Sequence, residues 1–158
     1  MLIGLISDTH GLLRPEALAA LSNVELIIHA GDVGKPGILE RLRSIAPVVA
    51  VRGNIDKGAW AAALPSSAVA HAGDADLYVL HDVNELDLDP AAAGFAAVVS
   101  GHSHQPASCR RSGVLFINPG SAGPRRFKLP ITLARLDTGT DPWNLEFIHL
   151  PVPPTPAP

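Results

Sequence analysis

Carboxylate and imidazole side chains recur in this sequence at the points where apolar runs end. The first run, residues 2–6, stops in Ser7-Asp8-Thr9-His10-Gly11. Asp8 and His10 are two positions apart, so in an extended chain both side chains point to the same side. An oxygen and a nitrogen donor together suit a first-row divalent cation. The pair alone is weak evidence, because Asp8 could equally cap a following helix.

The same arrangement of polar residues after an apolar run occurs four more times. The later groups are Asp32, Asn54, His81, and the pair His102 and His104. If these strands are parallel, their carboxyl ends meet at one edge, where ligands of α/β sheets collect. Two carboxylates, four imidazoles and one amide exceed the needs of one ion but suit two ions that share a carboxylate. Mixed oxygen and nitrogen donors favour Mn, Fe, Ni, Co or Zn over Mg or Ca.

The elements that must position these residues follow from the apolar runs and the prolines. Strands 24–30 and 47–51 alternate with short helices at 15–21 and 36–44, each with proline in its first turn. This alternation predicts βαβ units and a parallel sheet, hence an α/β fold. The second half predicts a buried strand at 95–99 and a short helix or turn at 89–93. It also predicts three hairpins, which pair 68–71 with 77–80, 107–110 with 114–117, and 131–136 with 143–150.

Composition limits the remaining possibilities. The 158 residues, 47% hydrophobic and 17% charged, predict one folded domain at 1–150 and a Pro-rich tail at 151–158 without assigned function. No apolar run is long enough for a membrane span, and no basic segment precedes the first run as in a signal peptide. The single cysteine, Cys109, suits a cytoplasmic location. A net charge of −3 argues against nucleic-acid binding, and an exposed hairpin edge could pair two subunits in a homo-oligomer.

The ordered motifs resemble those of the calcineurin-like metallophosphoesterases, and in particular their small YfcE-like phosphodiesterase branch. The motifs are Asp8-x-His10, Gly31-Asp32, Gly53-Asn54-x-Asp56, His81, Gly101-His102-x-His104, Asn118-Pro119-Gly120-Ser121 and Pro124-Arg125-Arg126. The resemblance implies a four-layer α/β/β/α sandwich, in which two mixed β-sheets face each other and helices flank them.

The resemblance also implies how the site works. Asp8, His10, Asp32 and His104 would hold one divalent ion, and Asp32, Asn54, His81 and His102 a second, with Asp32 shared. Manganese is the leading metal, and Ni, Fe, Co or Zn are alternatives. A hydroxide between the metals would attack a small phosphate ester in line, with diesters preferred. Asn54 and Arg52 are the candidate substrate contacts.

Two positions depart from the family pattern. Ile55 stands where many relatives carry a histidine that protonates the leaving group, so no general acid is identified. Esters with good leaving groups should therefore react much faster than alkyl esters. Asp82 stands where relatives often have glycine, and it either orients a neighbouring imidazole or faces solvent.

Other polar and aromatic residues have structural interpretations. We expect His29 to be a hydrogen-bonded core residue, Asp56 to support the Asn54 turn, and Cys109 to be inert in a strand. We expect Trp60 and Trp143 to be packing residues, and His71 and His149 to be structural or surface residues. Arg125, Arg126 and Lys128 either rim the site or are solvated loop charges, and we favour the second alternative.

Two other functions compete with hydrolysis of a small ester. The retromer subunit of eukaryotes shares this fold and serves as a protein-binding scaffold, but a scaffold would be free to lose ligands, and here all seven are present. A nuclease is opposed by the acidic balance and by the lack of interleaved basic and aromatic residues.

Overall fold

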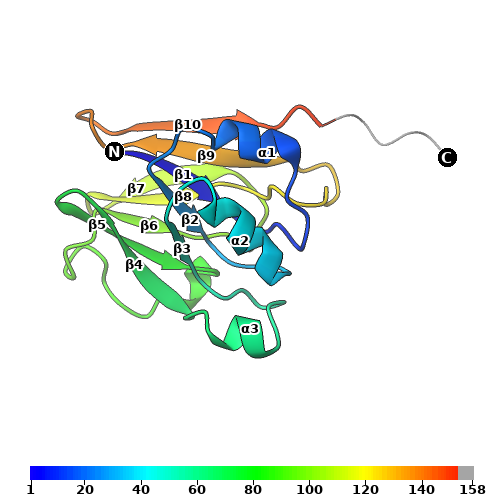
Figure 1. The fold of residues 1–158 in the computed structure, drawn as a ribbon. Helices are drawn as coiled ribbons and strands as arrows, with labels where there is room; N and C mark the ends of the chain where they lie inside the picture. Colours follow the sequence, from blue (N-terminus) through cyan, green and yellow to red (C-terminus); the bar gives the residue numbers. More distant parts are fainter. Residues whose placement is uncertain (153–158) are drawn as a thin grey trace.

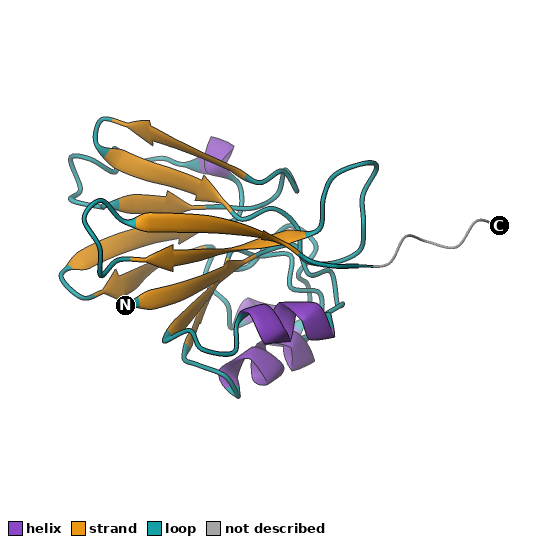
Figure 2. Ribbon diagram, turned by 90° about the horizontal axis from the view of Figure 1, so that it is seen from above, coloured by secondary structure: helices purple, strands orange, loops and turns teal. Residues whose placement is uncertain are grey.

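The computed structural model describes residues 1–152 and contains two five-stranded β-sheets that face each other (Figures 1 and 2). The first sheet has the order β10-β9-β1-β2-β3, in which β1, β2 and β3 are parallel and β9 is antiparallel to β1. Its strands are β1 (Leu2–Ile6), β2 (Leu26–His29), β3 (Val48–Ala50), β9 (Thr132–Asp137) and β10 (Asn144–His149).

The second sheet has the order β4-β5-β6-β8-β7, in which β5, β6 and β8 are parallel. Its strands are β4 (Ser67–Ala72), β5 (Ala75–Leu80), β6 (Ala97–Val99), β7 (Ala107–Arg111) and β8 (Val114–Asn118). The three predicted hairpins are confirmed as β4–β5, β7–β8 and β9–β10.

Alternating side chains of the central strands feed two separate cores. Ile3, Leu5 and Ile28 point between the sheets and pack with Leu77 and Val99 of the second sheet. The intervening residues of the same strands point to the helices instead, as Ile6 and Ile27 pack with Leu21, Leu39 and Leu42. Strands β1 and β2 are therefore buried on both faces, which explains their uninterrupted apolar sequence.

The helices cover the two sheets unequally. Helices α1 (Pro15–Ala20) and α2 (Pro36–Arg43) begin with proline as predicted and cover the outer face of the first sheet (Figure 2). The short α3 (Ala59–Ala62), which the sequence did not predict, joins the same core through Trp60. On the second sheet, the part of the chain that the structure describes offers only the 3₁₀ turn η1 (Val83–Glu85) and a small apolar cluster around Leu80.

The predicted fold is confirmed in its two mixed sheets and its helical layer, whereas the fourth layer is reduced to one 3₁₀ turn. Trp60 and Trp143 are packing residues, as expected. The polar groups follow strands of both sheets, because β5 and β6 belong to the second sheet. Residues 90–94 form a turn, the second of the two alternatives predicted for this segment. No helix within residues 1–152 is long and apolar enough to span a membrane. Of the predicted tail, only Pro151 and Val152 lie within the described residues.

Candidate metal centre

Five loops at the carboxyl ends of β1, β2, β3, β5 and β6 converge where the two sheets meet. Backbone hydrogen bonds join them: Asp8 N donates to Gly31 O (3.0 Å), His10 N to Asp32 O (2.9 Å), and Gly101 N to His81 O (2.9 Å). Parallel strands inside each sheet bring their carboxyl ends to the same side. All seven predicted ligands consequently lie in one connected cluster.

The loop backbones are strained where they converge. Positive φ angles between 47° and 71° occur at five of the seven predicted ligands, namely Asp8, His10, Asp32, His102 and His104. A left-handed conformation costs a non-glycine residue about 1 kcal/mol or more, and such strain collects at functional sites. Close approach adds a second constraint: a Cβ at Gly53 would collide with the Asp32 carboxylate, and one at Gly101 with Ser7 Oγ.

Asp8 lies at the centre of the buried half of the cluster. Its Oδ1 is 3.3 Å from His104 Nε2 and 3.7 Å from His10 Nε2. Asp8 Oδ1 and His10 Nε2 are buried, and neither has a hydrogen-bond partner among the described residues. The other oxygen, Oδ2, accepts hydrogen bonds from Ser7 Oγ (2.7 Å) and His102 N (3.1 Å). Burial raises the pKa of Asp8, but the nearby imidazoles of His10 and His104 and the hydrogen bond from Ser7 Oγ outweigh it and lower the pKa below its usual range.

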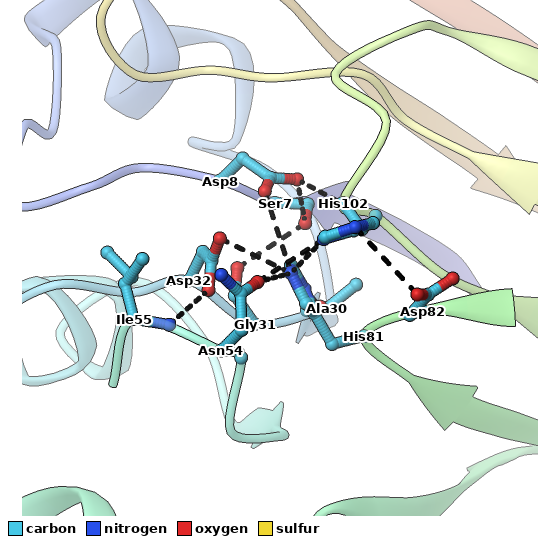
Figure 3. Close-up of polar contacts among 12 residues, drawn as sticks. Ser7, Asp8, Ala30, Gly31, Asp32, Asn54, Ile55, His81, Asp82 and His102 are labelled. Atoms are coloured by element: carbon cyan, nitrogen blue, oxygen red, sulfur yellow. Dashed lines mark hydrogen bonds and ion pairs between the residues drawn. The ribbon is translucent and has the colours of Figure 1, made fainter. Parts of the chain in front are cut away.

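Asp32 connects this half to the more exposed half of the cluster, and Figure 3 shows it beside His81 and Ile55. Its Oδ2 is 3.5 Å from His10 Nε2 and 3.3 Å from His81 Nε2, while Oδ1 accepts a hydrogen bond from Ile55 N (3.0 Å). Burial raises the pKa of Asp32, but the hydrogen bond with His81 and that from Ile55 N lower it overall. Asp32 thus stays ionised and faces histidines of both halves.

His81, Asn54 and His102 complete the exposed half. Asn54 Oδ1 lies 3.0 Å from His81 Nε2 and 3.2 Å from His102 Nδ1. His81 Nδ1 lies 2.7 Å from Ala30 O, so in the neutral ring Nδ1 donates and Nε2 presents a lone pair to the cluster. Burial lowers the pKa of His81, but Asp32 and Ala30 O raise it overall. Turning the Asn54 amide would bring its NH₂ to 3.2 Å from Asp32 Oδ2.

The donor set fits divalent cations. In both halves, carboxylate, imidazole and amide groups, all of which can donate lone pairs to a metal, converge on the same space. Two groups of three ligand atoms, from Asp8, His10 and His104 and from Asp8, Asp32 and His81, lie within 4.8 Å of one another. A cation would satisfy the unpaired Asp8 Oδ1 and His10 Nε2, which are otherwise costly to bury.

The supporting residues explain how the loops keep their shape. Asp56 is buried and accepts hydrogen bonds from Gly53 N (2.8 Å), Gly34 N (2.9 Å) and Val33 N (3.1 Å), so it ties the loops after β2 and β3 together. Asp82 caps η1 by accepting from Asn84 N (3.0 Å), and its Oδ2 lies 3.8 Å from His102 Nε2. Asp82 thus lies beside an imidazole of the cluster, at a distance too long for a hydrogen bond, and its two predicted alternatives both stay open.

Arg52, a predicted substrate contact, donates from Nη1 to Leu64 O (2.9 Å). It lines a pocket of about 240 Å³ beside Asn54, His81 and His102, and Asp82 and Glu85 add carboxylates to the same wall. The position is suitable for a substrate contact, although one guanidinium nitrogen is already committed to the backbone.

Four further predictions concern residues outside the cluster. His29 is a hydrogen-bonded core histidine, as expected: it lies 3.0 Å from Thr9 Oγ1 and accepts from Gly31 N (3.2 Å). Its burial lowers its pKa to about 4. His71 and His149 are exposed on β4 and β10, and His71 pairs with Asp76. Cys109 is exposed on β7.

The sequence did not single out Ser7, whose hydroxyl donates to Asp8 Oδ2. For Arg125 and Arg126 it left two alternatives, the rim of the site or solvated loop charges. Both arginines are exposed, as expected, but they also line a pocket of about 200 Å³ with His10, His104 and Pro124. The motif Pro124-Arg125-Arg126 can be recognised in the sequence, but only the fold shows that it lies beside His104.

Two facing sheets with a carboxylate–imidazole cluster at their strand ends are the framework of a metal-dependent α/β domain. The chain belongs to the calcineurin-like phosphoesterase superfamily, whose domain model matches residues 1–141. It is 35% identical over 150 residues to a probable metallophosphoesterase of Methanothermobacter thermautotrophicus, with 87% of each chain covered.

Two solved structures show the range of proteins with this fold. The phosphoesterase YfcE of E. coli is 25% identical, covers 87% of this chain and 89% of its own, and superposes with a TM-score of 0.67. Vps29 of Chaetomium thermophilum is 20% identical, with 96% and 100% covered and a TM-score of 0.76. The likeness to Vps29 concerns the fold alone.

Proposed function

We propose that this phosphoesterase-family chain is a dinuclear metal-dependent phosphodiesterase. The observation that carries the proposal is the convergence of seven donor side chains from five loops, with Asp8 Oδ1 and His10 Nε2 buried and without a partner among the described residues. Asp8, His10, Asp32 and His104 would hold one ion. Asp32, Asn54, His81 and His102 would hold the other.

The charges of the cluster favour an anionic substrate. Two divalent ions bring four positive charges and the carboxylates of Asp8 and Asp32 return two negative ones, so the loaded site is positive in a chain of net charge −3. When bound, such ions polarise phosphoryl oxygens and lower the pKa of water toward neutrality. The chain itself orients the donors, through the Ser7–Asp8 and His81–Ala30 hydrogen bonds.

The surroundings of Asn54 bear on the leaving group. Ile55 follows Asn54, is 38% exposed, and offers no proton-donating side chain. A departing alkoxide would thus find no acid at this position, whereas a phenolate departs without one. The proposed preference for diesters over monoesters rests on the resemblance to YfcE-like phosphodiesterases.

Metal analysis of the purified protein, paired with hydrolysis of bis-p-nitrophenyl phosphate, tests the proposal. We expect two equivalents of metal after Mn²⁺ loading, and Mn²⁺-stimulated activity that is lost in Asp32→Ala. Asp76→Ala is the matched control, because Asp76 pairs with His71 on the surface and should leave activity unchanged. Unchanged activity in Asp32→Ala would remove Asp32 as the shared ligand, and one equivalent of metal would refute a dinuclear centre.

The scaffold alternative draws support from the Vps29 fold, and inactivity of the metal-loaded protein toward mono- and diesters would favour it. The retained donor set favours the enzyme. Manganese as the native metal, homo-oligomerisation and a cytoplasmic location stay predictions.

A further inference from the structure

The loop that follows β8 is attached directly to the candidate metal centre. Ser121 Oγ donates to Asp8 O (3.0 Å), and Ala122 N donates to Ser7 O (3.1 Å). Gly123 O accepts from the guanidinium of Arg14 (3.3 Å from Nη2), and a Cβ at Gly123 would collide with Thr9 O. The base of the loop is therefore fixed relative to the backbone that carries Asp8.

The tip of the same loop projects away from the protein. Leu129 N donates to Arg126 O (3.1 Å) and closes a turn with Phe127 and Lys128 at its tip. Phe127 is 88% exposed, and the next most exposed large hydrophobic residue in the described part is Met1 at 41%. Its φ of 54° is left-handed, which is uncommon and costly for a bulky residue. The ring of Phe127 is thus uncovered, on a loop whose base is fixed, and it is available to a ligand.

Cationic side chains connect this tip to the metal centre. Arg125 and Arg126 line the pocket of about 200 Å³ that His10 and His104 also line. Within residues 1–152 neither arginine forms an ion pair with a carboxylate. Residues 90–136 contain six of the twelve Lys and Arg residues of the chain and no Asp or Glu. The positive charge of the loop is thus not neutralised by nearby sequence.

We propose that residues 124–128 are the recognition arm of this site and select nucleotide-type phosphoesters, in which a planar base and a second anionic group accompany the reacting phosphate. The inference rests on the proposed function, because the metal centre takes the reacting phosphate and leaves the arginines free for the other anion. Arginine binds phosphate in a bidentate manner, and an exposed aromatic ring stacks on a base with little regard to its identity. Phe127 holds the base, while Arg125 and Arg126 hold the second anion.

A lipid surface is the competing partner for an aromatic residue flanked by basic ones. Membrane docking by an exposed face needs a broader apolar patch than one ring. Phe127 has no strongly exposed apolar companion on its own turn, where its neighbours are Arg126 and Lys128. The arginines also face a pocket shared with His10 and His104, which places them beside the reacting group. These observations favour a small nucleotide-type ligand.

Matched p-nitrophenyl diesters test the role of Phe127. Thymidine 5′-(p-nitrophenyl phosphate) and methyl p-nitrophenyl phosphate share a leaving group and differ in the base and sugar. We expect the Mn²⁺-loaded wild type to favour the thymidine ester by about tenfold or more in kcat/KM, and Phe127→Ala to lose most of this preference. Its rate on the methyl ester should stay within about twofold. Val69→Ala, which trims an exposed apolar residue on β4, is the control.

A 3′-phosphate on the thymidine ester tests the arginines. We expect it to lower KM by about tenfold in the wild type and to have no effect in Arg125→Ala/Arg126→Ala. Equal wild-type rates on the thymidine and methyl esters, or binding to phosphatidylglycerol vesicles that Phe127→Ala abolishes, would overturn the recognition arm. Either result would leave the proposed function intact. The proposed function is refuted by a different outcome, in which neither ester is hydrolysed with any metal.

Discussion

The two halves of the metal cluster lie at different depths in the molecule. The side chains of Asp8 and His104 are 0% and 4% exposed and that of His10 is 18% exposed, whereas His102 is 46% exposed. Asn54 is also exposed. His81 is the buried member of this second half, at 7%. The buried half has unpaired donor atoms, while in the exposed half the ring nitrogens and the amide contact one another. Water competes less for the ion in the buried half than in the exposed half. The buried half should therefore bind its ion more tightly.

Removing one histidine from each half gives the largest expected difference. We expect His104→Ala to reduce kcat/KM on bis-p-nitrophenyl phosphate by about 1,000-fold, since a bound metal contributes several kcal/mol. His102→Ala should cost about tenfold at saturating Mn²⁺, because solvent can occupy the position of an exposed ligand. Metal content after dialysis should fall further in His104→Ala. Equal losses in both variants would show that depth does not separate the halves.

The leaving group provides the second test, on the exposed side where Ile55 follows Asn54. We expect a p-nitrophenyl ester to react at least about 100-fold faster than an alkyl ester of the same phosphate, beyond the difference that leaving-group acidity alone produces in solution. Ile55→His should raise the alkyl rate by about tenfold or more and leave the p-nitrophenyl rate unchanged. Near-equal rates of the wild type on both esters would reveal another acid.

Two carboxylates outside the donor set, Asp56 and Asp82, support the loops of the cluster, and they too lie at different depths. Asp56 is buried and accepts three backbone N–H groups of the loops that carry Asp32 and Asn54, whereas Asp82 caps an exposed 3₁₀ turn. We expect Asp56→Asn to weaken Mn²⁺ affinity by about 10- to 100-fold and Asp82→Asn by less than about tenfold, as measured by calorimetric titration. A larger effect of Asp82→Asn would make its 3.8 Å contact with His102 the dominant support.

The sequence predicts most of the strands and the members of the cluster, because both depend on local patterns. Apolar runs locate strands such as β2, and polar residues after them locate Asp32 and Asn54. It cannot predict which sheet a strand joins, since β5 and β6 pair through contacts distant in sequence. For the same reason the motif with Arg125 could be recognised, but its position beside His104 could not be derived. The short α3 lacks a cap or a periodic pattern, and Gly58 precedes it.

The pH dependence of stability is the last test, and it concerns His29 beneath the buried half. Burial lowers the pKa of His29 to about 4, from 6.5 in the unfolded chain. The unfolded state therefore binds more protons between these values, so the stability is complete above pH 6.5 and is lost as the pH falls toward 4. We expect His29 to account for about 2 kcal/mol of the decrease in unfolding free energy between pH 7 and 5.

Urea unfolding of the wild type and of His29→Gln, both in EDTA, measures this contribution. The ligand residues titrate in both proteins, so the difference between the two pH profiles belongs to His29. His29→Gln should be less stable at pH 7 but should lose less stability on acidification. Parallel pH profiles would mean that His29 gains its proton without unfolding, and that its contacts with Thr9 and Gly31 can accommodate a charge.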